Sequence, residues 1–282
     1  MGAIAGGLGA AAFWALGTLC SSRASRTIGA GPALGWVMAI GLLLITPFVI
    51  ASGRPAELDP GSGSWLAAAG IANLAGLVCI FTAFRVGKVS IIAPIASAEG
   101  AFAAILAVVA GEHLMLVEVG VLAVIACGIA MAAASSGQPD DDTTHTATAS
   151  VLALAAAALF GFTLYATARA SDSLPVAWVL VPARLLGALA LALPLAFAGR
   201  LKMTREALPL VLVSACCEVL GLTAFALGSR DGVAVTAVIG SQFAGLSAVA
   251  AFILFRERLA RIQVVGVAAT VAGVACLSAL VR

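Results

Sequence analysis

The chain has 282 residues, of which 62% are hydrophobic and only 10% are charged, and its formal net charge is +2. Soluble globular domains carry about 25% charged residues, so this composition excludes an ordinary soluble fold. It also argues against nucleic acid as a partner, because the basic residues are scattered between apolar runs rather than gathered into a basic face or stripe.

Ten apolar runs follow one another along the chain and predict ten transmembrane helices. Each run has about 18–23 residues, which is long enough to cross the hydrocarbon core of a bilayer as a helix. The expected spans are residues 2–20, 33–50, 65–84, 90–110, 116–134, 150–168, 176–197, 208–227, 233–255 and 263–280. The first span has no basic residues before it, so we do not expect a cleaved signal. The predicted fold class is an all-α membrane protein.

One long polar segment separates the fifth apolar run from the sixth. It contains Pro139, three successive aspartates at residues 140–142 and several threonines. This composition is typical of a solvated linker. We therefore expect residues 136–149 to connect a first five-helix repeat, residues 1–135, to a second one, residues 150–282.

The two halves of the chain repeat one another. Arg85 and Glu112 recur 145 residues later as Arg230 and Glu257, and the tripeptide Arg-Ala-Ser that follows the first span recurs 146 residues later, after the sixth. The alternative is chance similarity between alanine-rich helices, which is weakened because these matches fall on charged corners. Because five spans per half is an odd number, the second half enters the membrane from the opposite side. The sequence thus predicts an inverted repeat, an architecture that many secondary transporters share.

The corners after the fourth and ninth spans carry a further shared pattern. One corner reads Gly111-Glu112-His113-Leu114, with Val119-Gly120 and Gly128 after it, and the other reads Arg256-Glu257-Arg258-Leu259, with Val265-Gly266 and Gly273 after it. With these paired motifs the whole chain resembles the ten-helix, EamA-type branch of the drug/metabolite transporter superfamily. Two departures are that Glu99-Gly100 lies where the family often has Glu-Pro, and that Arg256 lies where it prefers glycine.

Three ionisable residues lie near the middle of predicted spans, namely Glu99, Arg184 and Glu218. A charge there costs about 2.5–3.5 kcal/mol on insertion scales, so each should face protein or water and have a partner. One arginine cannot cancel two carboxylates, and a surplus carboxylate in low dielectric is neutralised by a proton unless a cation supplies the charge. Glu99 or Glu218 is therefore a candidate for proton coupling. Alternatively, Arg184 binds a substrate carboxylate while a glutamate binds its ammonium, or the arginine and one glutamate only lock the helices together.

Five other residues are candidates for the substrate path. Asn73 and Gln242 lie at a similar depth to the charged residues, and Trp14 lies in the middle of the first span, with Thr18 one turn further on. Tyr165 in the sixth span is a weaker candidate. For Trp14 the alternative is simple packing against a neighbouring helix. The resemblance implies that helices three, four, eight and nine line the central cavity, with help from helices one, two, six and seven.

The corner glutamates and the charge distribution bear on structure and orientation. We expect Glu112 and Glu257 to cap the following helix or to pair with Arg256, Arg258 or Arg261. The loops after odd-numbered spans carry ten basic residues and the other loops carry four, which by the positive-inside rule puts both termini outside. The family resemblance implies cytoplasmic termini instead, so the sequence leaves the orientation open.

Together these observations predict a multi-pass transporter of the inner or plasma membrane. We expect it to move a small metabolite, such as an amino acid or an amphipathic compound, by alternating access, with export as the favoured direction and protons or exchange as the driving force. Its expected partners are the substrate, protons and the lipid bilayer, and it works as a monomer or dimer. We expect no cofactor and no metal: there is no phosphate-binding loop for ATP, and both histidines lie in corners.

Two other classes of function are less favoured by the sequence. A membrane assembly or scaffold subunit without transport would have no reason to bear the insertion cost of three mid-span charges. An intramembrane enzyme would need a nucleophile with a base, or a metal centre. No histidine and no pair of aspartates lies within the predicted spans, so enzyme activity is not expected.

Overall fold

The computed structural model describes residues 1–53, 60–86, 95–133 and 143–243, together with residues 246, 262, 265–266, 268–269, 272–273 and 276. Within these residues the chain is helical and contains no β-strand. Six helices there are long and apolar enough to cross a membrane, so the chain is a multi-pass, all-α membrane protein. The predicted count of ten spans stays a prediction, because parts of the fourth, ninth and tenth lie outside the described residues.

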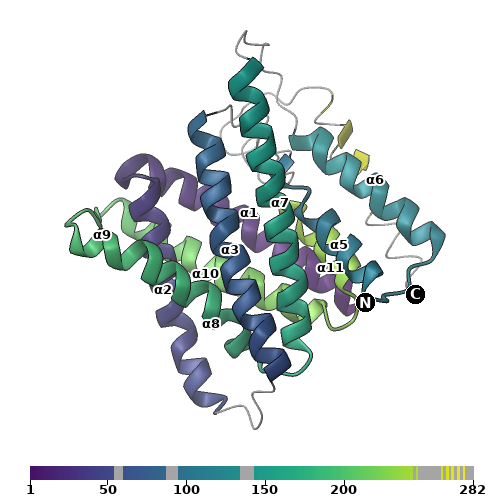
Figure 1. The fold of residues 1–282 in the computed structure, drawn as a ribbon, viewed down its shortest axis with the longest axis horizontal. Coiled ribbons are helices and arrows are strands. Elements are labelled where there is room, and N and C mark those ends of the chain that lie inside the picture. Colours follow the sequence, from purple (N-terminus) through teal and green to yellow (C-terminus); the bar gives the residue numbers. More distant parts are fainter. Residues whose placement is uncertain are drawn as a thin grey trace.

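The helices are named in chain order in Figure 1. They are α1 (Gly2–Ile28), α2 (Ala30–Ala51), α3 (Pro60–Val86), α5 (Glu99–Val109), α6 (Leu116–Ala133), α7 (Thr143–Ser171), α8 (Val176–Gly187), the π-helical segment η1 (Ala188–Ala192), α9 (Leu193–Phe197), α10 (Ala207–Gly228) and α11 (Val233–Gly240).

The two halves of the chain interleave rather than form separate bundles. Helix α1 packs along α10 and α11 of the second half, and α3 packs along α7, beside which it lies in Figure 1. Helices α2 and α8 pack against each other, as do α5 and α11. Helix α6 lies at the outer edge of the bundle (Figure 1). The middle of the molecule is therefore built by helices from both halves.

Two helix boundaries and one segment inside a helix differ from the sequence-based expectations. Helix α1 continues past the predicted end at Cys20 because residues 21–28 contain no glycine or proline, and it ends before Gly29, whose φ is +92°. Helix α7 begins at Thr143, so the second part of the predicted linker is helical. The seventh span is continuous but contains η1, just before Pro194. Proline has no N–H and cannot donate the usual backbone hydrogen bond inside a helix. A single π turn is a local change of the hydrogen-bond pattern within an α-helix, and here it lies next to the proline.

Equivalent corners of the two halves have the same backbone conformation. Gly53 follows α2 with φ of +68°, and Gly199 follows α9 with φ of +64°. This left-handed conformation is open to glycine without steric cost and is strained for other residues. The two glycines are 146 residues apart, the offset at which the sequence repeat makes them equivalent.

The fourth span is interrupted near its middle, where a continuous helix was expected. Residues 95–96 are helical, residues 97–98 form a turn, and α5 begins at Glu99. At the interruption the amide of Ala98 bonds the carbonyl of Ile95, three residues back, at 3.1 Å. Because this break precedes Glu99, the carboxylate belongs to the first turn of a helix. A negative charge is stabilised there by the helix dipole.

The ninth span has an equivalent interruption. Helix α11 ends at Gly240, and residues 241–242 form a turn. The hydroxyl of Ser241 and the side-chain Nε2 of Gln242 both donate to the carbonyl of Val238, at 2.9 and 3.3 Å. Side chains that bond nearby carbonyls compete with the helical backbone bonds. The turn lies 144 residues after the turn at residues 97–98, within one residue of the offset of the sequence repeat, so both halves interrupt the equivalent helix at nearly the same place.

The contact between α1 and α10 depends on small residues. A Cβ atom added at Gly6 would lie 2.5 Å from Cα of Gly228 and 2.6 Å from the carbonyl oxygen of Ala224, which are backbone atoms that cannot rotate away. We expect Gly6→Ala to lower stability by about 1–3 kcal/mol through overpacking. The measurement is the thermal unfolding midpoint in detergent, with Gly120→Ala in α6, where a Cβ atom meets nothing within 4 Å, as the control. Equal midpoints for the two variants would contradict the close contact.

Candidate functional site: a central pocket

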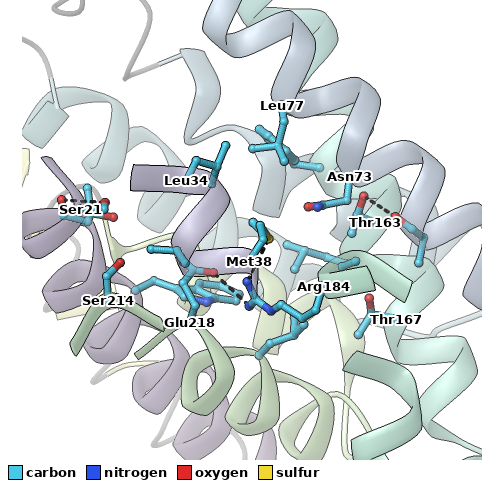
Figure 2. A pocket seen from close by; sticks show the side chains of 18 of the residues that line it. Ser21, Leu34, Met38, Asn73, Leu77, Thr163, Thr167, Arg184, Ser214 and Glu218 are labelled. Carbon is cyan, nitrogen blue, oxygen red and sulfur yellow. Dashed lines mark hydrogen bonds and ion pairs between the residues drawn. The ribbon is translucent and has the colours of Figure 1, made fainter. Parts of the chain in front are cut away.

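A pocket of about 290 Å³ lies in the middle of the bundle (Figure 2). Helices α1, α2, α3, α5, α7, α8 and α10 all contribute to its wall. It is lined by Trp14, Thr18, Ser21, Ser25, Ala30, Leu34, Val37, Met38, Ala69, Asn73, Leu77, Glu99, Phe160, Thr163, Leu164, Thr167, Val179, Pro182, Ala183, Arg184, Ser214, Glu218, Leu222 and Phe243. Its chemistry is mixed, with an apolar and aromatic wall and a small group of charged and hydroxyl side chains.

An ion pair lies at the centre of the pocket. Nη2 of Arg184 is 3.3 Å from a carboxylate oxygen of Glu218, and Nη1 is 3.5 Å from the sulfur of Met38. Figure 2 shows the guanidinium lying between these two side chains. Arg184 is only 3% exposed, whereas Glu218 is 34% exposed. The Nε of Arg184 is buried and has no hydrogen-bond partner among the described residues.

The contact between α2 and α8 is arranged almost symmetrically around this arginine. Arg184 crosses over Gly41 of α2, where an added Cβ would lie 3.1 Å from its Cδ. Met38 crosses over Gly187 of α8, where an added Cβ would lie 2.7 Å from its Cγ. Both members of each pair, Met38 with Arg184 and Gly41 with Gly187, are 146 residues apart. The two equivalent side chains thus meet, and only one of them is charged.

A second pair of equivalent contacts forms the aromatic wall. The indole of Trp14 lies over Gly221 of α10, where an added Cβ would be 2.6 Å from its Cδ1. The ring of Phe160 lies over Gly76 of α3, where an added Cβ would be 2.7 Å from its Cε1. Both rings line the pocket. Trp14 also packs edge-on against Phe243, with ring centroids 6.2 Å apart. This tryptophan therefore lines the pocket and also packs against a neighbouring side chain.

Glu99 lies in the pocket wall at the start of α5. Among the described residues, no hydrogen bond or ion pair involves its carboxylate, and the charge of Glu218 acts on it. Arg184 is paired with Glu218, so Glu99 is the surplus carboxylate of the three mid-span charges. With two carboxylates and one arginine, the pocket carries a net charge of −1 when all three groups are ionised.

Six of the eight site residues predicted from the sequence line the central pocket. The six that line the pocket are Trp14, Thr18, Asn73, Glu99, Arg184 and Glu218. The other two do not line it. Tyr165 packs edge-on against Trp65, with ring centroids 5.7 Å apart, and under Arg169. Gln242 is 3% exposed and bonds within its own turn.

Sequence reasoning missed Met38 and Phe160. An isolated methionine or phenylalanine in an apolar helix carries no signal of its own. The repeat could have found both, because Met38 is equivalent to Arg184 and Phe160 is equivalent to Trp14 at an offset of 146 residues.

The lining residues of the pocket continue toward one end of the bundle only. On α1 they run from Trp14 through Thr18 to Ser25, and on α2 they begin at Ala30, so they reach the connection between these helices. We call this the α1–α2 end. Toward the opposite end, where α10 stops and α11 starts, two packed apolar clusters follow. One contains Ala10, Trp14, Ala103, Leu164, Ala168, Phe225 and Ala237, and the other contains Ala107, Tyr165 and Ala234.

Glu112 closes this second end, which we call the α10–α11 end. Its carboxylate accepts hydrogen bonds from the backbone N–H groups of Val233 and Ala234 at 3.2–3.3 Å. It therefore caps α11 of the other half and not the helix that follows it, which corrects the capping expected for Glu112. Glu257 and the expected pairing partners Arg256, Arg258 and Arg261 lie outside the described residues. Burial raises the pKa of Glu112, against the opposing effect of the two N–H donors, and the charge of Glu118 raises it further. Glu118 itself accepts from the N–H of Met115, at 2.8 Å.

Comparisons with known proteins bear on the fold and the family. Residues 1–134 match the EamA-like transporter family. A solved crystal structure of a protein superposes on the chain with a TM-score of 0.81, over 99% of this chain and 96% of its own length, at 16% sequence identity. At that identity the likeness shows the fold alone. The comparison with curated proteins finds no match.

Proposed function

We propose that this chain, whose residues 1–134 belong to the EamA-like transporter family, is a secondary active transporter of the inner or plasma membrane. It moves a small metabolite by alternating access through the central pocket. The observation that carries the proposal is the pocket itself, midway along helices of both halves, with the Arg184–Glu218 pair in its wall beside Glu99, which has no partner among the described residues. Intramembrane charges facing a cavity are typical of substrate and ion pathways.

Two inverted five-helix repeats, residues 1–135 and 150–282, are part of this proposal. The equivalent contacts support it: Met38 and Arg184 cross between α2 and α8, and Trp14 and Phe160 each cover a glycine of the other half. The equivalent breaks before α5 and after α11 support it as well. Discontinuous helices at the interface of repeats form the central sites of several transporter folds. Alternating access would then proceed by rocking of the halves about the α2–α8 contact.

The charges of the pocket favour a substrate that brings positive charge. The net charge of −1 is balanced when Glu99 binds either a proton or the ammonium group of a substrate. An amphipathic amine would place its apolar part against the aromatic wall of Trp14 and Phe160. An amino acid would in addition offer its carboxylate to the guanidinium of Arg184, which lines the pocket. Competition between a proton and an ammonium at Glu99 couples substrate movement to the pH gradient.

Counterflow in proteoliposomes tests the proposal. Full-length protein is reconstituted, preloaded with one unlabelled compound at a time from a panel of amino acids and amphipathic amines, and given a trace of the same labelled compound outside, with and without a pH gradient. We expect transient accumulation of label for at least one compound. The label should accumulate faster when the pH gradient is present. Absence of counterflow across the panel would overturn the transporter proposal and favour a non-transporting scaffold subunit.

A further inference from the structure

The α10–α11 end is closed by structure from both halves of the chain. At this end α1 begins, α5 and α10 end, and α11 begins. The hydroxyl of Thr236 in α11 lies 2.6 Å from the carbonyl oxygen of Gly232 and 3.2 Å from that of Ala3 in the first half. Within the second half, Nε of Arg230 donates to the carbonyl of Ser171 at 3.1 Å. Opening the central pocket toward this end requires these helix ends to separate, because the two apolar clusters fill the space between them.

Glu112 is placed where such a separation has to start. It belongs to the connection between α5 and α6 in the first half of the chain, and both of its carboxylate oxygens bond the first N–H groups of α11 in the second half. The backbone holds it in place, since its own N–H donates to the carbonyl of Ala107 at 2.9 Å. Its Oε1 lies 3.4 Å from the position of a Cβ atom at Gly232, the residue just before α11, so the carboxylate is in contact with the start of that helix.

A second pocket, of about 500 Å³, lies on the outer side of this contact. Glu112, Tyr165, Arg169 and Val233 are among the residues that line it. Ala107 and Tyr165 belong both to its wall and to the outer of the two apolar clusters. Glu112 therefore stands beside the thin apolar layer between an outer vestibule and the interior of the bundle.

We propose that Glu112 is a positioning residue of the transport cycle, which holds α11 on the first half of the chain and keeps the α10–α11 end closed while the pocket is accessible from the α1–α2 end. The inference rests on the proposed function, because only a protein that alternates between two accessible ends needs such a contact to break. Removing the carboxylate leaves the first N–H groups of α11 without their acceptor in the closed form only, since water can bond them once the end opens. The closed form is then disfavoured relative to the open one.

Side-specific labelling of single cysteines tests this role in the full chain. The background is a protein with its six cysteines replaced and with counterflow retained. Ala107→Cys reports on the α10–α11 end, and Ser25→Cys reports on the α1–α2 end, and the rate of modification by a small water-soluble thiol reagent is measured for each. We expect Glu112→Ala to raise the rate at Ala107→Cys about fivefold, which corresponds to the usual effect of losing a helix cap. The rate at Ser25→Cys does not rise, which separates opening of one end from general loosening.

Two further variants distinguish a cap between halves from a general structural effect. Glu112→Gln keeps an acceptor oxygen at the same length and should leave the rate at Ala107→Cys close to that of the parent. Glu118→Ala removes a carboxylate that lines the same vestibule but, among the described residues, bonds only the N–H of Met115 in its own corner. This variant should also leave the rate unchanged. An unchanged rate in Glu112→Ala, or an equal rise in Glu118→Ala, would overturn the proposal.

A variant that fails to fold does not end the test. Glu112→Asp keeps the charge but is shorter by one methylene, so it cannot reach both N–H groups, and it should raise the rate at Ala107→Cys in the same direction; an unchanged rate there would also overturn the role of Glu112. The labelling rate does not depend on any substrate. Absence of counterflow in the unchanged protein would therefore contradict the proposed function. A labelling rate that does not change in the Glu112 variants would contradict only the role of Glu112.

Discussion

Replacing Glu99 with glutamine is expected to remove the effect of a pH gradient on transport. The carboxylate has no partner among the described residues, lies in the pocket wall and feels the charge of Glu218. Glutamine keeps the size and the hydrogen-bonding capacity of the side chain but can neither bind nor release a proton. Gradient-driven accumulation should therefore fall to the level measured without a gradient, while exchange of labelled for unlabelled substrate continues. The measurement is uptake into proteoliposomes with and without a pH gradient.

The matched variant for this prediction is Glu218→Gln. Its carboxylate is bonded to Arg184, so this change breaks an ion pair as well as removing a titratable group. We expect it to lower stability, which Glu99→Gln should not do. If both variants keep full gradient-driven transport, the proton hypothesis fails. If Glu99→Gln also loses exchange, the carboxylate binds the ammonium of the substrate directly.

The second large effect is expected at the ion pair itself. Arg184→Met leaves the carboxylate of Glu218 unpaired in the middle of the bundle. Breaking a buried pair costs about 3–5 kcal/mol, and the partial exposure of Glu218 to the pocket favours the lower end of that range. At about 2–4 °C per kcal/mol, this predicts a fall of roughly 10 °C in the apparent unfolding temperature, measured in one detergent against the unchanged protein.

The repeat supplies the control for this experiment. Arg184→Met combined with Glu218→Asn gives the second half the residues that the first half carries at the equivalent positions, Met38 and Asn73. Removing both charges leaves none unpaired, so the double variant should recover most of the lost stability. It should not recover transport. A double variant with normal counterflow would show that the pair only holds the helices together.

The sequence predicted the residues whose presence in a membrane span needs an explanation. Placing Glu99, Arg184 and Glu218 at that depth is unfavourable in free energy. Facing a shared cavity lowers this cost for all three side chains. The repeat at a fixed offset predicted which corners are equivalent, and Gly53 and Gly199 have matching conformations. Charge and periodicity are strong signals in a bilayer because so few polar residues are present.

The features that the sequence could not predict depend on the rotation and the interruption of helices. Tyr165 and Leu164 are neighbours, and only the leucine faces the pocket, because one residue turns a helix by about 100°. Gln242 lies in a turn that contains no proline, so the sequence gives no sign of the turn. The capping of α11 by Glu112 joins residues 121 and 122 positions apart, and no local pattern encodes a partner at that distance.

The unequal pair at the crossing of α2 and α8 has an energetic consequence. In a carrier with identical halves, exchanging their conformations would return the same structure turned over, so its two access states would have equal free energy. Here one half contributes Arg184 and Glu218 where the other contributes Met38 and Asn73. If the halves exchange conformations as proposed, the surroundings of the ion pair change with each exchange. Gradients alone fix the direction of net transport, but the empty carrier then rests in one state, and its apparent affinity for substrate differs between the two faces of the membrane.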